Sequence, residues 1–286
     1  MSFVAPKGTT FVRLLGGGSV FVVALVHEGE RALVCKRLVP RALAAREGRI
    51  AMVREARLLS LASHPALPAL VRVGNDAQGP FFLETFVAGT SVSSLVRGWQ
   101  ERGARVPATL VRHVAILALE ALAELHALAD ETGPLDVVHG DLGPAHVVLG
   151  PLGEVRFVDL GAARFRGLEA ELETDDRGTL PYAAPELASG MAKPSQATDV
   201  YALAATLVFL ATGERLCEAD TEAAMLAEVA TRGLRRELAA RAEAFETKER
   251  EALFEALDPE PSRRRVSARD LCEVFGRPLP RAPELR

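Results

Sequence analysis

Apolar residues in the first third of the chain come in short runs, and glycine or charged segments separate these runs. The first three are Phe11–Leu15, Val20–Val26 and Arg31–Leu38. Gly16-Gly17-Gly18 lies between the first two runs, and the polar segment His27–Glu30 separates the second from the third. Short apolar runs bounded by turn-forming residues are typical of strands. We therefore expect a β-rich N-terminal region.

Longer apolar segments with helical spacing follow. Segment Arg49–Ala62 predicts a helix that ends at Ser63-His64-Pro65, because proline disfavours helix in the residue before it. Its apolar positions are Ile50, Val53, Leu58 and Leu61. Segment Ala108–Leu128 is apolar nearly all round, which predicts a buried helix. Another buried helix is expected to begin near Thr198, and the C-terminal two thirds are therefore predicted to be mostly helical.

Segment His139–Gly161 combines two apolar runs with two carboxylates. Runs Val147–Leu149 and Val155–Val158 flank the turn signal 150–153, a pattern that predicts a β-hairpin. Asp141 lies before the first run, and Asp159 follows the second. A carboxylate at the end of an apolar strand is costly to desolvate unless it meets a cation, a metal or a hydrogen-bond donor. Either aspartate alone is more often a turn or cap residue. Together they suggest carboxylates that converge on one site.

Composition excludes several classes of protein. The chain has 286 residues, of which 49% are hydrophobic and 25% charged, as in ordinary soluble proteins. A formal net charge of −4 gives no support for nucleic-acid binding. No apolar run is long enough to span a bilayer, and the N-terminal residues do not resemble a signal peptide. The 3 isolated cysteines indicate neither a disulfide framework nor a zinc site, so we expect a cytoplasmic protein.

Four segments resemble motifs of the protein-kinase family. His139-Gly140-Asp141-Leu142 is similar to its catalytic loop and Asp159-Leu160-Gly161 to its metal-binding turn. Segment Leu15–Val23 resembles its glycine-rich loop, and Gly178–Glu186 resembles the segment that cradles the substrate peptide. The resemblance implies a bilobal α+β fold. Its N-lobe would cover residues 1–88, its C-lobe 89–280, and residues 281–286 would form a tail.

The resemblance also implies binding of ATP with Mg²⁺ or Mn²⁺. Lys36 would anchor phosphates and Glu55 would orient it, although alone Lys36 could be an edge-strand lysine and Glu55 a solvated charge. Asp141 would accept the hydroxyl proton of the substrate, and Asp159 would bind the metal. The residues expected to bind the nucleotide are Gly16, Gly18, Val23, Val34, Lys36, Val148 and Asp159.

Three further elements are expected from the resemblance. Segment 81–89 is similar to the strand and hinge that bind adenine, but the register leaves open whether Leu83 or Glu84 guards the back pocket. Asp199 would tie down the catalytic-loop backbone, or would be a plain N-cap. Arg265 would form a buried ion pair with Glu186.

Four residues depart from the family pattern. Phe21 replaces the third glycine of the loop and could crowd the phosphates. Gly143 stands where a lysine is usual, and His146 replaces a metal-binding asparagine with an imidazole, a poorer match to Mg²⁺. Gly140 replaces the arginine that usually pairs with a phosphorylated activation loop, which argues against control by such phosphorylation.

These patterns lead to two hypotheses. The first is a bacterial eukaryote-like Ser/Thr protein kinase of weak or specialised activity, with a protein as substrate. The second is a pseudokinase that senses nucleotide or binds a regulatory protein as a scaffold. Phosphotransfer to a small molecule is disfavoured, because the Gly178–Glu186 segment and the helix of Asp199 resemble those of protein kinases.

Overall fold

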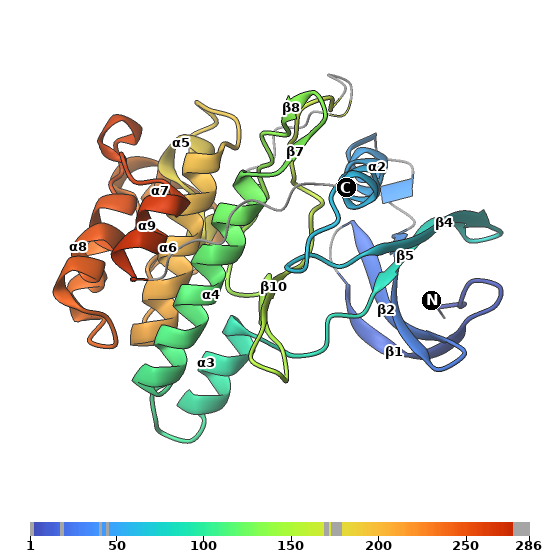
Figure 1. Ribbon diagram of the computed structural model, residues 1–286, viewed down its shortest axis with the longest axis horizontal. Coiled ribbons are helices and arrows are strands. Elements are labelled where there is room, and N and C mark those ends of the chain that lie inside the picture. Colours follow the sequence, from blue (N-terminus) through green and yellow to red (C-terminus); the bar gives the residue numbers. More distant parts are fainter. Residues whose placement is uncertain are drawn as a thin grey trace. The chain divides into compact units, whose positions relative to one another are not determined.

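The computed structural model describes residues 3–17, 20–39, 42–43, 46–168, 172 and 179–276. The chain divides into two units, and the division falls between Ala88 and Gly89. The first unit holds the described residues up to Ala88 together with Leu168 and Leu172, and the rest belongs to the second. Figure 1 shows a strand-rich first unit and a mostly helical second unit, an α+β architecture with two lobes. The predicted fold class is therefore confirmed.

One antiparallel sheet forms the centre of the first unit. Its strand order is β1-β2-β3-β5-β4, with bounds Thr10–Gly17, Phe21–Glu28, Arg31–Leu38, Gly79–Thr85 and Leu70–Asp76 in that order. The alternation of side chains along each strand places Val26, Leu33, Cys35, Phe81 and Leu83 together in a buried apolar cluster. The residues that alternate with them in β3 and β5 face the other way, and this second face carries Lys36.

Helix α2, Arg46–Leu61, belongs to the same unit. It begins three residues earlier than the sequence predicts and stops before the His64-Pro65 turn, as expected. Ile50 and Leu58 are buried, whereas Val53 and Leu61 are exposed. The apolar spacing therefore predicted the helix correctly but overstated the width of its buried face. The buried face also includes Glu55, which has no exposed area.

Helices dominate the second unit. They are α3 Val92–Gln100, α4 Ala108–His126, α5 Pro185–Ala188, α6 Gln196–Thr212, α7 Glu222–Arg232, α8 Thr247–Ala256 and α9 Ala268–Val274. Three 3₁₀ turns are η2 Leu180–Tyr182, η3 Arg236–Arg241 and η4 Pro261–Arg263. Helix α6 is apolar nearly all round and packs against α3, α4 and α8, so it forms the centre of this unit.

Short strands carry the loops of interest. Strands β9, Val147–Leu149, and β10, Val155–Phe157, pair as the predicted hairpin, and β6, Thr90–Ser91, joins them on the β9 side. A two-stranded ribbon comprises β7, Ala129–Asp130, and β8, Gly133–Pro134. The hairpin β9–β10 places Asp141 before its first strand and Asp159 after its second, as the sequence indicates.

Candidate active site

Lys36 and Glu55 form a buried ion pair in the first unit. Lys36 Nζ donates a hydrogen bond of 2.5 Å to Glu55 Oε1, and the two residues are 4% and 0% exposed. Strand β3 supplies the lysine and helix α2 supplies the glutamate. A buried ammonium is costly unless a carboxylate meets it, so this contact also ties the helix to the sheet. The alternatives of an edge lysine and a solvated glutamate are excluded by this burial.

The strand register places further expected residues beside Lys36. Val23 lies opposite Lys36 in the β2–β3 pair, and Gly16 lies opposite Val23 in the β1–β2 pair. Val34 precedes Lys36 by two positions in β3 and therefore shares its face of the sheet. Gly18 lies outside the described residues, so the structure tests nothing about it. Lys36, Val23 and Val34 therefore lie on one face of the sheet, and Gly16 lies opposite Val23.

Phe21 packs near the ammonium of Lys36. Its side chain is nearly buried, and its ring centroid lies 6.0 Å from Lys36 Nζ. The ring meets Phe82 edge-on at 6.5 Å, and the Phe82 centroid is 5.8 Å from the same nitrogen. Two aromatic rings therefore wall the ammonium, and Phe21 serves as part of the sheet face that holds Lys36.

The structure settles the register at the end of β5. Val34 pairs with Glu84, and Cys35 pairs with Leu83. Directly opposed residues share a face, so Glu84 lies on the Lys36 face and Leu83 lies in the apolar cluster behind it. Glu84 is 3% exposed, and its Oε1 lies 3.6 Å from Lys36 Nζ. The sequence left open whether Leu83 or Glu84 lies on this face, and it did not indicate the contact between Glu84 and Lys36.

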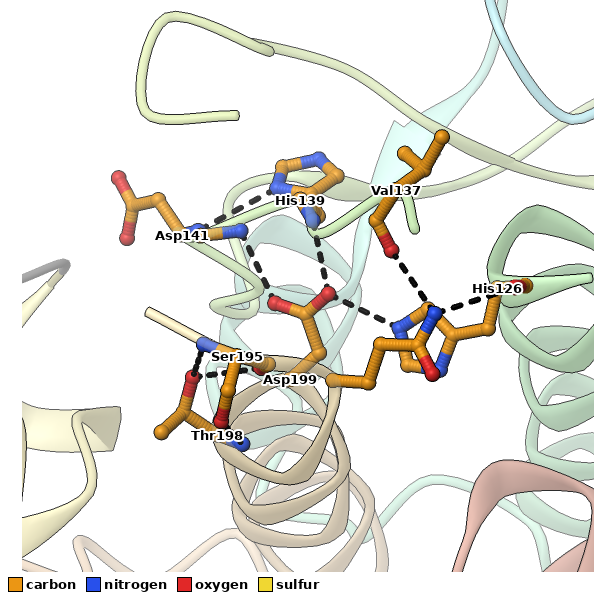
Figure 2. A network of polar contacts seen from close by, with 9 residues as sticks. His126, Val137, His139, Asp141, Ser195, Thr198 and Asp199 are labelled. Atoms are coloured by element: carbon orange, nitrogen blue, oxygen red, sulfur yellow. Dashed lines mark hydrogen bonds and ion pairs between the residues drawn. The ribbon is translucent and has the colours of Figure 1, made fainter. Parts of the chain in front are cut away.

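In the second unit, Asp199 fastens the loop that begins at His139 (Figure 2). The backbone N–H groups of His139 and Gly140 donate to its two carboxylate oxygens at 2.7 and 2.9 Å. His126 Nε2 donates to the same carboxylate at 3.0 Å, because a carboxylate can only accept. Asp199 is nearly fully buried on α6. Three donors therefore hold one ionised side chain and fix the backbone ahead of Asp141.

The alternative that Asp199 caps α6 is wrong. Ser195 is the N-cap residue, and its side chain and that of Thr198 form a reciprocal capping box. Figure 2 shows Ser195 and Thr198 joined to each other beside Asp199, whose carboxylate points to the loop. With the helix end already satisfied, the carboxylate of Asp199 is available for the loop.

Gly140 has a backbone that only glycine adopts easily. Its φ is +81°, and a β-carbon built there would lie 2.4 Å from the carbonyl oxygen of Ala162. Two hydrogen bonds between Val138 and Arg164 bring these segments together, with N···O distances of 2.8 and 2.9 Å. The absence of a side chain at Gly140 is therefore required by this close approach.

His139 is a buried, neutral imidazole. The backbone N–H of Asp141 donates to its Nδ1 at 3.4 Å, and Nε2 has no hydrogen-bond partner among the described residues. Burial, as the dominant cause, lowers the pKa of His139, although the nearby Asp199 opposes this shift. The ring stacks at 6.5 Å on His146 and meets Phe157 edge-on at 6.0 Å. His139 thus supports the loop by packing.

His146 lies beside both aspartates of the candidate site. Its Nδ1 donates to the carbonyl oxygen of Asp141 at 2.7 Å and lies 3.6 Å from the Asp141 carboxylate. Its Nε2 lies 3.8 Å from Asp159 Oδ2. The carbonyl contact assigns a proton to Nδ1, because a carbonyl oxygen only accepts. The structure therefore brings together the three expected residues Asp141, His146 and Asp159.

Asp141 and Asp159 differ in how they are held. The backbone N–H of Thr179 donates to Asp141 Oδ1 at 2.6 Å, which fixes that carboxylate against η2. Asp159 has a φ of +67°, a left-handed conformation that costs a residue with a β-carbon about 1–3 kcal/mol. Its side chain remains 46% exposed. Strain of this kind at the end of β10 marks a position where the direction of the carboxylate matters.

Gly143 and Val148 complete the expected set. A β-carbon at Gly143 would meet Thr179 and Tyr182 at ordinary contact distances of 3.7 Å, so the backbone tolerates a side chain there. The missing cation is therefore a property of the sequence and is not imposed by the backbone. Val148 is nearly buried in β9 and pairs with Ser91 and Arg156.

One predicted contact is wrong by one residue. Arg264, and not Arg265, donates to Glu186, and this pair is buried on η4's C-terminal side and α5. Arg265 is exposed. The guanidinium of Arg264 also lies 5.1 Å from the ring centroid of Tyr201, which gives the buried charge a second contact. Both arginines lie in irregular backbone after η4, so which of them is buried could not be read from composition or period.

The donor set fits a divalent cation held mainly by oxygen. Mg²⁺ is usually held by one or two carboxylates together with substrate phosphates, and exposed Asp159 meets that need. Within the described residues, no group of three or more His, Cys, Asp or Glu forms an all-protein cage. His146 adds a nitrogen beside Asp159, a donor that suits transition metals better than it suits Mg²⁺.

Comparison with known proteins agrees with this geometry. The family model for the protein kinase domain matches residues 9–274. The chain belongs to the protein kinase family. Kinase domains use ATP and a divalent metal in general, and their substrates include proteins. All three cysteines of this kinase domain are free and buried, and none of its described helices is long and apolar enough to cross a membrane.

Known relatives include kinases of both acceptor types. Tyrosine-protein kinase MasK of Myxococcus xanthus is 30% identical over 217 residues, which are 74% of this chain and 33% of MasK. Serine/threonine-protein kinase PknD of Chlamydia trachomatis serovar L2b is 27% identical over 219 residues, 67% of this chain and 23% of PknD. A putative cyclin-dependent kinase F-2 of rice is 30% identical over 177 residues. The kinase domain thus spans a third or less of the two bacterial relatives.

Proposed function

We propose that this kinase domain transfers the γ-phosphoryl group of ATP to Ser or Thr of a protein, with weak or specialised activity. The observation that carries the proposal is the buried Lys36–Glu55 hydrogen bond of 2.5 Å. An ammonium already oriented by a glutamate can hold phosphates without further reorganisation. Three free, buried cysteines favour a reducing compartment, which we propose to be the cytoplasm.

Each candidate residue receives a role in this proposal. Lys36 anchors phosphates, and Val23, Val34 and Val148 supply apolar surface for the nucleotide. ATP supplies the phosphoryl group, and its divalent metal neutralises charge when bound.

Asp141 and Asp159 take different parts in the reaction. Asp141 orients the acceptor hydroxyl and takes its proton at the carboxylate, while Thr179 N–H holds the other carboxylate oxygen in place. Asp159 would hold the metal with its exposed carboxylate, and His146 Nε2 would be a second ligand beside it.

The catalytically impaired alternative is favoured by one region. Gly143 supplies no cation, and His146 supplies a nitrogen where an amide oxygen is usual. Both changes fall on the loop beside Asp141, so both weaken charge neutralisation at the transferred group. Under this alternative the domain binds nucleotide or a protein partner and acts as a scaffold.

Measurement of phosphotransfer by the wild type and by the Asp141→Asn variant distinguishes an active kinase from a scaffold. Asparagine keeps an oxygen for Thr179 N–H but cannot accept a proton, so turnover is expected to fall at least about 100-fold while ATP affinity stays within about twofold. Transfer of labelled phosphate to Ser/Thr and Tyr peptides measures turnover, and calorimetry measures affinity. The matched control Asp220→Asn removes an exposed carboxylate from the same unit. Equal turnover in wild type and Asp141→Asn would contradict the assigned base, and absence of turnover in wild type with retained ATP binding favours the scaffold.

A further inference from the structure

Glu84 places a second carboxylate beside Lys36, the lysine proposed to bind phosphates. The Lys36 ammonium has Glu55 Oε1 at 2.5 Å and Glu84 Oε1 at 3.6 Å. All three side chains are no more than 6% exposed. Two carboxylates and one ammonium have a formal charge of −1, whereas the Lys36–Glu55 pair alone is neutral.

The two carboxylates act on the lysine in different ways. The contact to Glu55 is short enough for a charge-assisted hydrogen bond, and helix α2 fixes its direction. The contact to Glu84 is longer than a hydrogen bond and acts through charge alone. Removal of the Glu84 charge therefore leaves the orienting bond of Lys36 in place.

The rigid sheet keeps Glu84 at this position. Its backbone is paired with Val34 in the middle of the five-stranded sheet, and Phe82 shares its face two residues earlier. The Phe21 and Phe82 rings wall the ammonium, so little water screens the charges. In such surroundings a fixed negative charge repels an incoming polyanion far more than it would at the surface.

We propose that Glu84 competes with nucleotide phosphates for Lys36 and so sets the domain's affinity for polyphosphate-bearing ligands. The inference rests on the proposed ATP binding and names the residue that weakens it. The expected effect grows with the number of phosphates on the ligand, because the repulsion acts between charges. A ligand without phosphates gains little when the carboxylate is removed.

The test compares Mg·ATP, Mg·ADP and adenosine by calorimetry for wild type, Glu84→Gln and Glu84→Met. Glutamine keeps the shape of the side chain, and methionine fills a similar volume without a polar group, so at least one folded neutral variant is expected. Far-UV circular dichroism and thermal melting without ligand check the fold. The control Glu28→Gln removes an exposed carboxylate from β2 in the same unit and changes the net charge equally.

The proposal expects Glu84→Gln to bind Mg·ATP about tenfold tighter than wild type, equal to about 1.4 kcal/mol. The gain is smaller for Mg·ADP and under about twofold for adenosine, and Glu28→Gln is unchanged. An equal gain for adenosine and Mg·ATP would overturn the proposal, because Glu84 would then act on the base or by volume. Unchanged or weaker Mg·ATP binding in the neutral variants overturns it while the proposed ATP binding stands. No binding of any nucleotide by any variant overturns the proposed ATP binding and this inference with it.

Discussion

His146 makes a hydrogen bond through one ring nitrogen and places the other near a carboxylate. Nδ1 donates to the Asp141 carbonyl, and Nε2 lies 3.8 Å from the Asp159 carboxylate. Metal-binding histidines commonly use this arrangement, in which the far nitrogen donates to a backbone carbonyl and the near one keeps its lone pair. We therefore propose that His146, the residue that departs from the family pattern, would be a metal ligand beside Asp159.

We expect His146→Asn to shift metal preference toward Mg²⁺. Replacing a nitrogen donor by an amide oxygen should tighten the Mg·ATP complex about tenfold, because Mg²⁺ prefers oxygen. Electron paramagnetic resonance of Mn²⁺ with ATP reports affinity and shows nitrogen coupling from the imidazole in wild type. His113→Asn, at an exposed histidine on α4, is the control. Absence of nitrogen coupling in wild type would remove His146 from the metal ligands.

At the scale of elements, the buried pair of Arg264 and Glu186 joins α5 to the segment after η4. The adjacent arginines Arg264 and Arg265 carry the same charge but differ in burial, which makes them a matched pair. Removing one partner of a buried ion pair leaves the other charge without compensation. The stability of this part of the second unit should therefore depend on one arginine and not on its neighbour.

Arg264→Met is expected to lower the free energy of unfolding by about 3–5 kcal/mol, whereas Arg265→Met changes it by less than about 0.5 kcal/mol. Urea unfolding followed by circular dichroism measures both. Similar losses in the two variants would show that the charge, and not the buried contact, stabilises this region. A greater loss of unfolding free energy in Arg265→Met than in Arg264→Met would indicate that Arg265, the residue expected from the sequence, is the partner of Glu186.

Elements were easier to predict than contacts. Strands β1 to β3, the β9–β10 hairpin and helices α2, α4 and α6 followed from apolar period and turn residues, whereas β5 followed from the family resemblance and β4 was not predicted. The family motifs named Lys36, Glu55 and Asp199. The partner of Glu186 was missed by one residue, because adjacent arginines in an irregular segment have identical composition. The place of Glu84 was left open, because a one-residue slip of a strand exchanges its two faces. Pairing with β3 decides that register, and pairing is not visible in one strand alone.

At the scale of the whole molecule, each unit contains only part of the candidate machinery. Lys36 and Glu55 belong to the first unit, and Asp141 and Asp159 belong to the second. A ligand that binds either set should stabilise the unit that holds that set.

Hydrogen–deuterium exchange with Mg·ATP tests each set separately. We expect slower exchange in β3 around Lys36 and in the turn Asp159–Gly161, by about tenfold at saturation. In Lys36→Met the slowing in β3 should disappear, while Lys7→Met, outside the sheet, should keep it. Absence of protection in one of the two segments would show that its residues do not bind the nucleotide.

The close approach at Gly140 also limits how this domain can evolve. Any β-carbon there would meet the carbonyl oxygen of Ala162, and the left-handed backbone adds its own penalty. The arginine usual in the family therefore cannot return by a single substitution, because the loop around residue 162 must first change its path. Control through an arginine at this position and a phosphorylated activation loop would therefore require the backbone around residues 140 and 162 to be rebuilt first.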